Sequence, residues 1–154
     1  PLAQLVVGMK KNTNGRLADA RLLAQLLADQ LGPRIQPLPR VIVPVPLHPS
    51  RLRERGFNQS LELARPLARR LDLPIALHAV ARIKPTPHQV GLSMQQRREN
   101  IRGAFQVADL PAAHIAILDD VVTTGATVHE LAREFRRAGA QSIEVWSLAR
   151  TAMA

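Results

Sequence analysis

The stretch from Ile115 to Thr127 reads IAILDDVVTTGAT and carries most of the information about the fold. Its first four residues, 115–118, form an apolar run that predicts a short buried strand. Two carboxylates and several small hydroxyl residues follow, and a helical pattern of apolar residues extends from Val128 to Ala138. A strand, a short loop and a helix in this order are typical of an α/β fold with a mainly parallel sheet.

Helical and strand patterns alternate along the rest of the chain. The apolar spacing predicts a helix over 17–31, and a β-branched run predicts a strand over 41–43. Asn58 is a candidate N-cap for a second helix, which either kinks at Pro66 or restarts there. Further strands are expected over 75–83 and 143–148.

Two basic segments lack apolar periodicity. We expect residues 47–57 to form a basic loop and residues 84–102 to form a long flexible loop, which in a compact domain is more often functional than idle. If the second segment becomes helical near Met94, Arg98 and Arg102 share one helix face, where they could simply pair with acidic residues.

The residues after the strand 115–118 predict a phosphate and sugar site. Ligands of open α/β sheets bind beyond the carboxyl ends of the strands. Backbone N–H groups at a helix N-terminus, together with threonine hydroxyls, can hold a phosphate, and Gly125 leaves room for its approach. Asp119 and Asp120 can accept hydrogen bonds from sugar hydroxyls or help to hold a divalent cation. Phosphate and diol recognition together suggest ribose 5-phosphate; the alternative is that these residues are solvated carboxylates and a plain helix cap.

Length and charge limit the protein classes that fit this sequence. The 154 residues suit one domain, 1–154, with a helical or hood segment over 1–40 and a core over 41–154. The net charge is +9, and 18 of the 21 basic residues are arginine, which favours bidentate contacts with phosphate. Residues 51–102 hold 11 basic and 4 acidic residues, so an anionic partner is expected there, either a phosphorylated small molecule or a nucleic acid.

The sequence lacks the motifs of several well-known classes of functional site. It contains neither G-x-x-x-x-G-K-[ST] nor a G-x-G-x-x-G after a strand, so a nucleoside triphosphatase or a dinucleotide enzyme is disfavoured. The five histidines lack metal-ligand spacing, and no nucleophile elbow occurs. There is no cysteine and no apolar run long enough for a membrane helix, so we expect a cytoplasmic protein.

Residues 115–127 resemble the phosphoribosyl pyrophosphate signature of type I phosphoribosyltransferases. Other segments resemble the ComF/GntX competence-protein branch of that fold: Pro44-Val45-Pro46, the run Arg51 to Gln59, and Gln89 to Phe105. The resemblance covers nearly the whole chain and implies a parallel twisted sheet flanked by helices, a small N-terminal hood and a flexible loop. Members of this branch commonly carry an N-terminal four-cysteine zinc ribbon, which this cysteine-free sequence does not contain.

The resemblance also implies roles for individual residues. Asp119 and Asp120 would be the catalytic carboxylates that bind the ribose hydroxyls, with Mg²⁺ held directly or indirectly. The 5-phosphate would lie on Thr123, Thr124, Gly125, Ala126 and Thr127. Pyrophosphate would contact the set Pro46, Leu47, Arg51, Arg53, Arg55, Lys84 and Arg98. A basic loop or a nucleic-acid patch remains the alternative for the three arginines of 51–55.

Two functional hypotheses follow. The first is a protein that binds phosphoribosyl pyrophosphate and Mg²⁺ and transfers ribosyl 5-phosphate to a nitrogen acceptor, as a phosphoribosyltransferase in the setting of competence, DNA uptake and natural transformation. The second is a non-catalytic adaptor that binds single-stranded DNA or competence proteins. With four aromatic residues and no tyrosine, the chain has few platforms for stacking bases.

Overall fold

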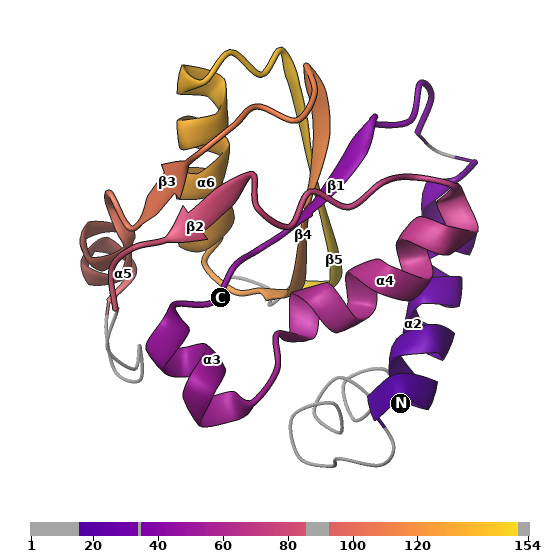
Figure 1. The fold of residues 1–154 in the computed structure, drawn as a ribbon, viewed down its shortest axis with the longest axis horizontal. Coiled ribbons are helices and arrows are strands. Elements are labelled where there is room, and N and C mark those ends of the chain that lie inside the picture. Colours follow the sequence, from indigo (N-terminus) through magenta and orange to yellow (C-terminus); the bar gives the residue numbers. More distant parts are fainter. Residues whose placement is uncertain (1–15, 34, 86–92, 151–154) are drawn as a thin grey trace.

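The computed structural model describes residues 16–33, 35–85 and 93–150, and it contains a parallel sheet (Figure 1). The strands are β1 (Val41–Pro44), β4 (His114–Val122) and β5 (Ser142–Arg150), in the order β1-β4-β5. Both neighbouring pairs are parallel. The short strands β2 (Val80–Arg82) and β3 (Phe105–Val107) form a separate antiparallel pair. The expected α/β fold is therefore confirmed.

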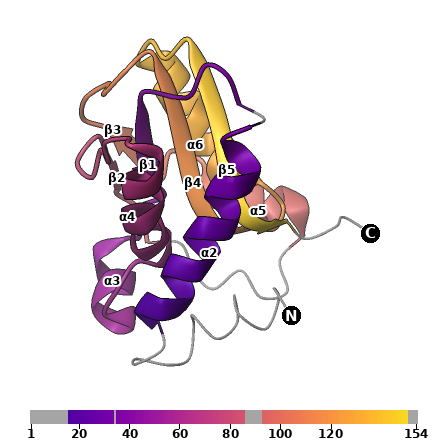
Figure 2. The ribbon, with the colours of Figure 1, turned by 90° about the vertical axis from the view of Figure 1, so that its right-hand side faces the viewer.

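Helices cover both faces of the parallel sheet. Figure 1 shows α6 (Ala126–Arg137) on one side and α2 (Arg16–Leu31) with α4 (Gln59–Leu71) on the other, and Figure 2 shows the same layers after a quarter turn. Two shorter helices, α3 (Pro49–Arg55) and α5 (Met94–Ile101), follow β1 and β2 in the chain. In the described part of the chain, no helix has the length and apolar character needed to cross a membrane.

Alternate side chains of the strands pack into two separate hydrophobic clusters, one on each face of the sheet. Val43 and Ile117 pack in the cluster that includes Phe135 of α6. Ile42 and Leu118, one position along each strand, belong to the cluster formed with α2 and α4. All five side chains have essentially no solvent exposure. A strand buried on both faces reads as a continuous apolar run, which is why 115–118 could be recognised from the sequence.

The predicted helices and outer strands agree largely with the structure. The expected helix 17–31 corresponds to α2, and Asn58 caps α4 as predicted by accepting a hydrogen bond from the Ser60 backbone N–H at 3.1 Å. Helix α4 continues through Pro66 without restarting. The final strand is longer than predicted and runs as β5 to Arg150.

Two segments predicted as loops contain helices. Within 47–57 the structure places α3, which begins after the cap residue His48 with Pro49 in its first turn and ends at Gly56 with φ of 75°. Proline is favoured in the first turn of a helix, and glycine is favoured where the chain takes a left-handed conformation at the helix end. Pro49 and Gly56 were therefore the sequence signals for α3 that the prediction did not use. Within 84–102 lies α5, which Ser93 and Gln96 begin with a capping box.

Strand boundaries differ from the predictions in two places. The predicted strand 75–83 is reduced to β2, because the chain bends at 77–79, between Ile75 and Val80. Ile75 itself forms a single parallel bridge with Ile42. The predicted strand 115–118 extends as β4 to Val122, since β5 continues to pair with it. Strand β3 was not predicted. The hood portion at 1–15 and the loop portion at 86–92 lie outside the described residues.

Candidate functional site

The carboxyl ends of β1 and β4 meet at one edge of the parallel sheet. The Val45 backbone N–H still donates to the Leu118 carbonyl at 2.9 Å, after which the chain leaves β1 through Pro46 and Leu47 toward α3. On the neighbouring strand, Asp119 and Asp120 follow Leu118 directly. The predicted carboxylates therefore lie beside the start of the predicted pyrophosphate loop. Unlike in the prediction, where they follow the strand, they belong to β4 itself.

Helix α4 fixes the position of the Asp119 carboxylate. Asn58 donates to the Val45 carbonyl at 3.0 Å, which ties the start of α4 to β1. In the first turn of α4, the buried Ser60 hydroxyl donates to Asp119 Oδ1 at 3.2 Å, and the Asp120 backbone N–H donates to the same oxygen at 3.0 Å. Ser60 was not predicted as a site residue, because its link to Asp119 spans 59 positions in the sequence.

Asp119 occupies an environment that disfavours its charge. The pKa of Asp119 is raised to about 7, mainly by burial and in addition by the charge of the neighbouring Asp120 carboxylate and a side-chain hydrogen bond with it. The hydrogen bonds from the Ser60 hydroxyl and the Asp120 backbone act in the opposite direction but are smaller. A bound cation would remove this conflict, because it would favour both carboxylates in their charged form.

Arg82 on β2 belongs to the same electrostatic environment. Burial lowers the pKa of Arg82, the charge of Arg51 lowers it further, and the charge of Asp119 raises it. The Arg82 guanidinium also lies over the Phe105 ring, 5.6 Å from its centroid. Arg51 and Asp119 are thus each close enough to act on Arg82. The sequence offered one signal for Arg82: it lies two residues before Lys84, within the same basic segment.

The other predicted pyrophosphate residues occupy varied positions. Arg53 and Arg55 lie on the exposed helix α3, where Arg55 donates to the Gln59 side chain at 3.1 Å. Lys84 donates to the Arg102 carbonyl at 3.1 Å, which ties the beginning of the predicted flexible segment to the end of α5. Arg98 projects from α5 and lines a cavity beside α6. For these four residues, pyrophosphate contact stays a prediction.

The predicted phosphate loop forms the turn between β4 and α6. Gly125 caps α6 with φ of 75°, a conformation that other residues rarely adopt. A β-carbon at this position would lie 4.0 Å from its nearest neighbour, a side-chain carbon of Val122, so there is space for one. Glycine is therefore favoured here by the backbone conformation and not by lack of space. The Thr124 hydroxyl accepts from the Ala126 backbone N–H at 3.4 Å, while Thr123 is exposed and Thr127 half-buried.

The donor set at this edge fits a magnesium ion. Asp119 and Asp120 supply carboxylate oxygens, the type of ligand that Mg²⁺ prefers, and Mg²⁺ typically binds through one or two carboxylates plus water and substrate phosphates. Within residues 16–33, 35–85 and 93–150, no three acidic, histidine or cysteine side chains gather into a complete metal cage. A magnesium ion held by these two carboxylates would need further ligands, such as water or phosphate oxygens.

The raised pKa of Asp119 predicts a specific dependence of stability on pH. A carboxyl whose folded pKa exceeds its unfolded value binds a proton more tightly in the folded state, so stability falls as the pH rises from about 4 to about 7. Without Mg²⁺, Asp119→Asn should flatten this part of the curve and stabilise the protein at pH 8 by on the order of 1–3 kcal/mol. Urea unfolding at several pH values measures the effect, and Asp109→Asn on the surface is the control. Equal pH profiles for wild type and Asp119→Asn would contradict the buried, raised-pKa state.

Comparisons with known proteins agree with the fold and name the family. Residues 58–152 match the phosphoribosyl transferase domain model. The structure of a purine phosphoribosyltransferase from Pyrococcus horikoshii Ot3 is similar, with a TM-score of 0.50 and 20% sequence identity, over 86% of this chain and 75% of that chain. At that identity, the similarity concerns the fold.

Two curated relatives are much closer in sequence. Competence protein F from Haemophilus influenzae is 41% identical over 135 residues, which is 85% of this chain and 59% of the relative. DNA utilization protein YhgH from Escherichia coli (strain K12) is 40% identical over 156 residues, 98% of this chain and 68% of the relative. This chain thus spans about three-fifths to two-thirds of their lengths. Taken with the domain match, these relationships mean that the chain belongs to the phosphoribosyl transferase domain family, in the group that includes competence protein F and DNA utilization protein YhgH.

Proposed function

We propose that this chain binds phosphoribosyl pyrophosphate together with Mg²⁺ and transfers ribosyl 5-phosphate to a nitrogen acceptor. The observation that carries the proposal is the half-buried Asp119 carboxylate beside Asp120, on the strand that leads directly into the 123–127 loop. One structural unit thus offers carboxylates that suit ribose hydroxyls and, three to eight residues later, backbone N–H groups at a helix N-terminus. The names of the curated relatives favour a setting in DNA uptake and use.

The residues at this edge suit the chemistry of the transfer. The bond between ribose C1 and pyrophosphate breaks, a bond between C1 and the acceptor nitrogen forms, and the acceptor loses a proton. Negative charge develops on the leaving pyrophosphate, which the nearby Arg51 and Arg82 guanidiniums would stabilise. Asp119 and Asp120 would hold the ribose hydroxyls and orient C1, and their negative charge favours the cationic character that C1 acquires. Bound Mg²⁺ would supply further charge neutralisation of the pyrophosphate.

Binding of phosphoribosyl pyrophosphate should require both carboxylates and the metal. Calorimetric titration of the ligand into the wild type should give saturable binding with Mg²⁺ and much weaker binding without it. Asp119→Asn/Asp120→Asn should weaken binding at least 100-fold, because each lost charge-assisted contact is worth about 1.5–3 kcal/mol. The control, Asp29→Asn/Asp109→Asn, removes the same charge from exposed positions and should bind normally. Undiminished binding by the Asp119 and Asp120 variant would show that the site is elsewhere.

Arg82 should act on the pyrophosphate end of the ligand. We expect Arg82→Ala to weaken phosphoribosyl pyrophosphate binding about 10-fold or more, the scale of one lost charged hydrogen bond, while ribose 5-phosphate affinity changes less than about twofold. Arg65→Ala, an exposed change on α4, is the control, and circular dichroism checks that each variant is folded. Equal losses for both ligands would assign Arg82 a structural role.

A second candidate function is the binding of single-stranded DNA, favoured by the net charge of +9 and by relatives described as DNA utilization proteins. A protein that neutralises four phosphates of single-stranded DNA should show a slope of log K against log salt of about −3. We therefore expect affinity for an oligothymidine to fall roughly 50-fold between 50 and 200 mM NaCl. Fluorescence anisotropy measures this, and no detectable binding at 50 mM NaCl would exclude direct DNA binding.

A further inference from the structure

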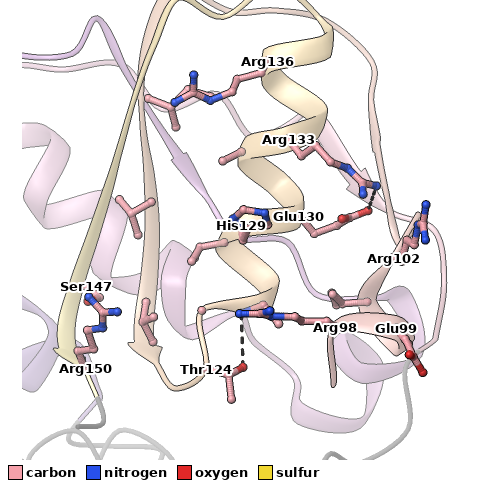
Figure 3. A pocket seen from close by; sticks show the side chains of 18 residues that line it. Arg98, Glu99, Arg102, Thr124, His129, Glu130, Arg133, Arg136, Ser147 and Arg150 are labelled. Carbon is pink, nitrogen blue, oxygen red and sulfur yellow. Dashed lines mark hydrogen bonds and ion pairs between the residues drawn. The ribbon is translucent and has the colours of Figure 1, made fainter. Parts of the chain in front are cut away.

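A cavity of about 770 Å³ lies along α6 (Figure 3). Its walls come from α5, α6, β5 and the end of β4, and it borders the 124–126 part of the phosphate loop. Asp119 and Asp120 are not among the residues that line it. The cavity therefore neighbours the carboxylate site without sharing its carboxylates.

The lining of this cavity is strongly cationic. Five arginines contribute, from three elements that are well separated in the sequence: Arg98 and Arg102 from α5 and the residue after it, Arg133 and Arg136 from α6, and Arg150 from β5. The acidic lining residues are Glu99 and Glu130. The positive charge is therefore a result of the fold, because no local stretch of sequence gathers these side chains.

The two acidic residues leave most of this charge uncompensated. Glu130 is 4% exposed, and its Oε1 accepts both from the Gly103 backbone N–H and from Arg133, each at 2.6 Å. Glu99 accepts from Gln95 at 3.0 Å. Among the residues that the structure describes, no ion pair involves Arg98, Arg102, Arg136 or Arg150. These four guanidiniums therefore offer positive charge to an anion that enters the cavity.

The remaining lining residues are mostly apolar. Val122, Val128, Ile143 and Val145 contribute, and Val145 is 45% exposed although it is a large apolar side chain in a strand. Arginines arranged around an apolar surface suit a ligand that has several phosphate groups and an apolar ring system. The volume lies within the range of about 300–1,000 Å³ that small-molecule sites occupy.

We infer that this cavity binds an organic polyphosphate of nucleotide size, with the phosphates held by the arginines of α5, α6 and β5 and the ring system against the apolar wall. This inference goes beyond the proposed function, because the arginines of α5, α6 and β5 hold the phosphates and the carboxylate pair does not, although the cavity borders the 124–126 loop and includes Arg98, a predicted pyrophosphate contact. A small ligand fits better than a nucleic-acid strand, because no phenylalanine, tyrosine or tryptophan lines the cavity, and strands are commonly held by bases stacked on such rings.

The test uses ATP as the probe, titrated without Mg²⁺ and followed by calorimetry, with an oligothymidine titrated in parallel. Arg102→Ala/Arg136→Ala removes two exposed arginines from the cavity. Arg40→Ala/Arg137→Ala is the matched control: it removes the same charge, one residue of the pair lies on the same helix, and neither lines the cavity. The same titration is repeated with Asp119→Asn/Asp120→Asn, which separates this cavity from the proposed phosphoribosyl pyrophosphate site.

We expect one ATP to bind per chain, with affinity reduced at least 10-fold in Arg102→Ala/Arg136→Ala and less than twofold in the control. Asp119→Asn/Asp120→Asn should keep ATP binding even where phosphoribosyl pyrophosphate binding is lost, so that each proposal can fail independently. Equal losses in the cavity and control variants, or loss of ATP binding with the carboxylates, would overturn the inference. Binding of oligothymidine but not ATP to the cavity arginines would also overturn it and assign the surface to nucleic acid.

Discussion

The site is organised around the burial of the Asp119 carboxylate beside that of Asp120. Carboxylates are rarely placed so close together in a partly dry environment, because burial and mutual repulsion both disfavour their charge. The surrounding structure holds the arrangement in place: Ser60 and the Asp120 backbone each donate to Asp119 Oδ1. Charged groups held in such an unfavourable environment are characteristic of functional sites, where a bound ligand or cation offsets the unfavourable electrostatic energy.

This constraint connects elements that are distant in the sequence. Asn58 joins α4 to the end of β1, and two residues later Ser60 joins the same helix to β4. Hydrogen bonds therefore connect the two strands, the start of the helix and the carboxylate. On the other side of the sheet, the Arg82 guanidinium rests over Phe105 within reach of the Asp119 charge. Opposite charges are thereby placed at the sheet edge before any ligand binds, and the proposed transfer would draw on this preorganisation.

The sequence predicted those parts of the fold that depend on local signals. The apolar run 115–118, the helix that became α2 and the Asn58 cap were recognisable because burial on both strand faces, helical periodicity and capping leave short-range patterns. Helix α3 was missed and α5 was expected only as an alternative beginning near Met94, because both bury little: α3 has no buried residue, and α5 is mostly polar. The signals for α3 were Pro49 and Gly56, and those for α5 were Ser93 and Gln96. These residues mark helix ends and produce no apolar periodicity.

The same distinction applies to the functional residues. Asp119, Asp120 and the 123–127 loop are contiguous, so they could be recognised together, whereas Ser60 and Arg82 reach the site from other elements and carry no local pattern. Tertiary structure also divides the basic charge, which in the sequence had pointed to a single basic segment. Arg51 and Arg82 belong to the carboxylate edge, while Arg98 and Arg102 join Arg150 around the cavity beside α6. Among the described residues, part of the positive charge is thus gathered at two places with different neighbours, one acidic and one largely apolar.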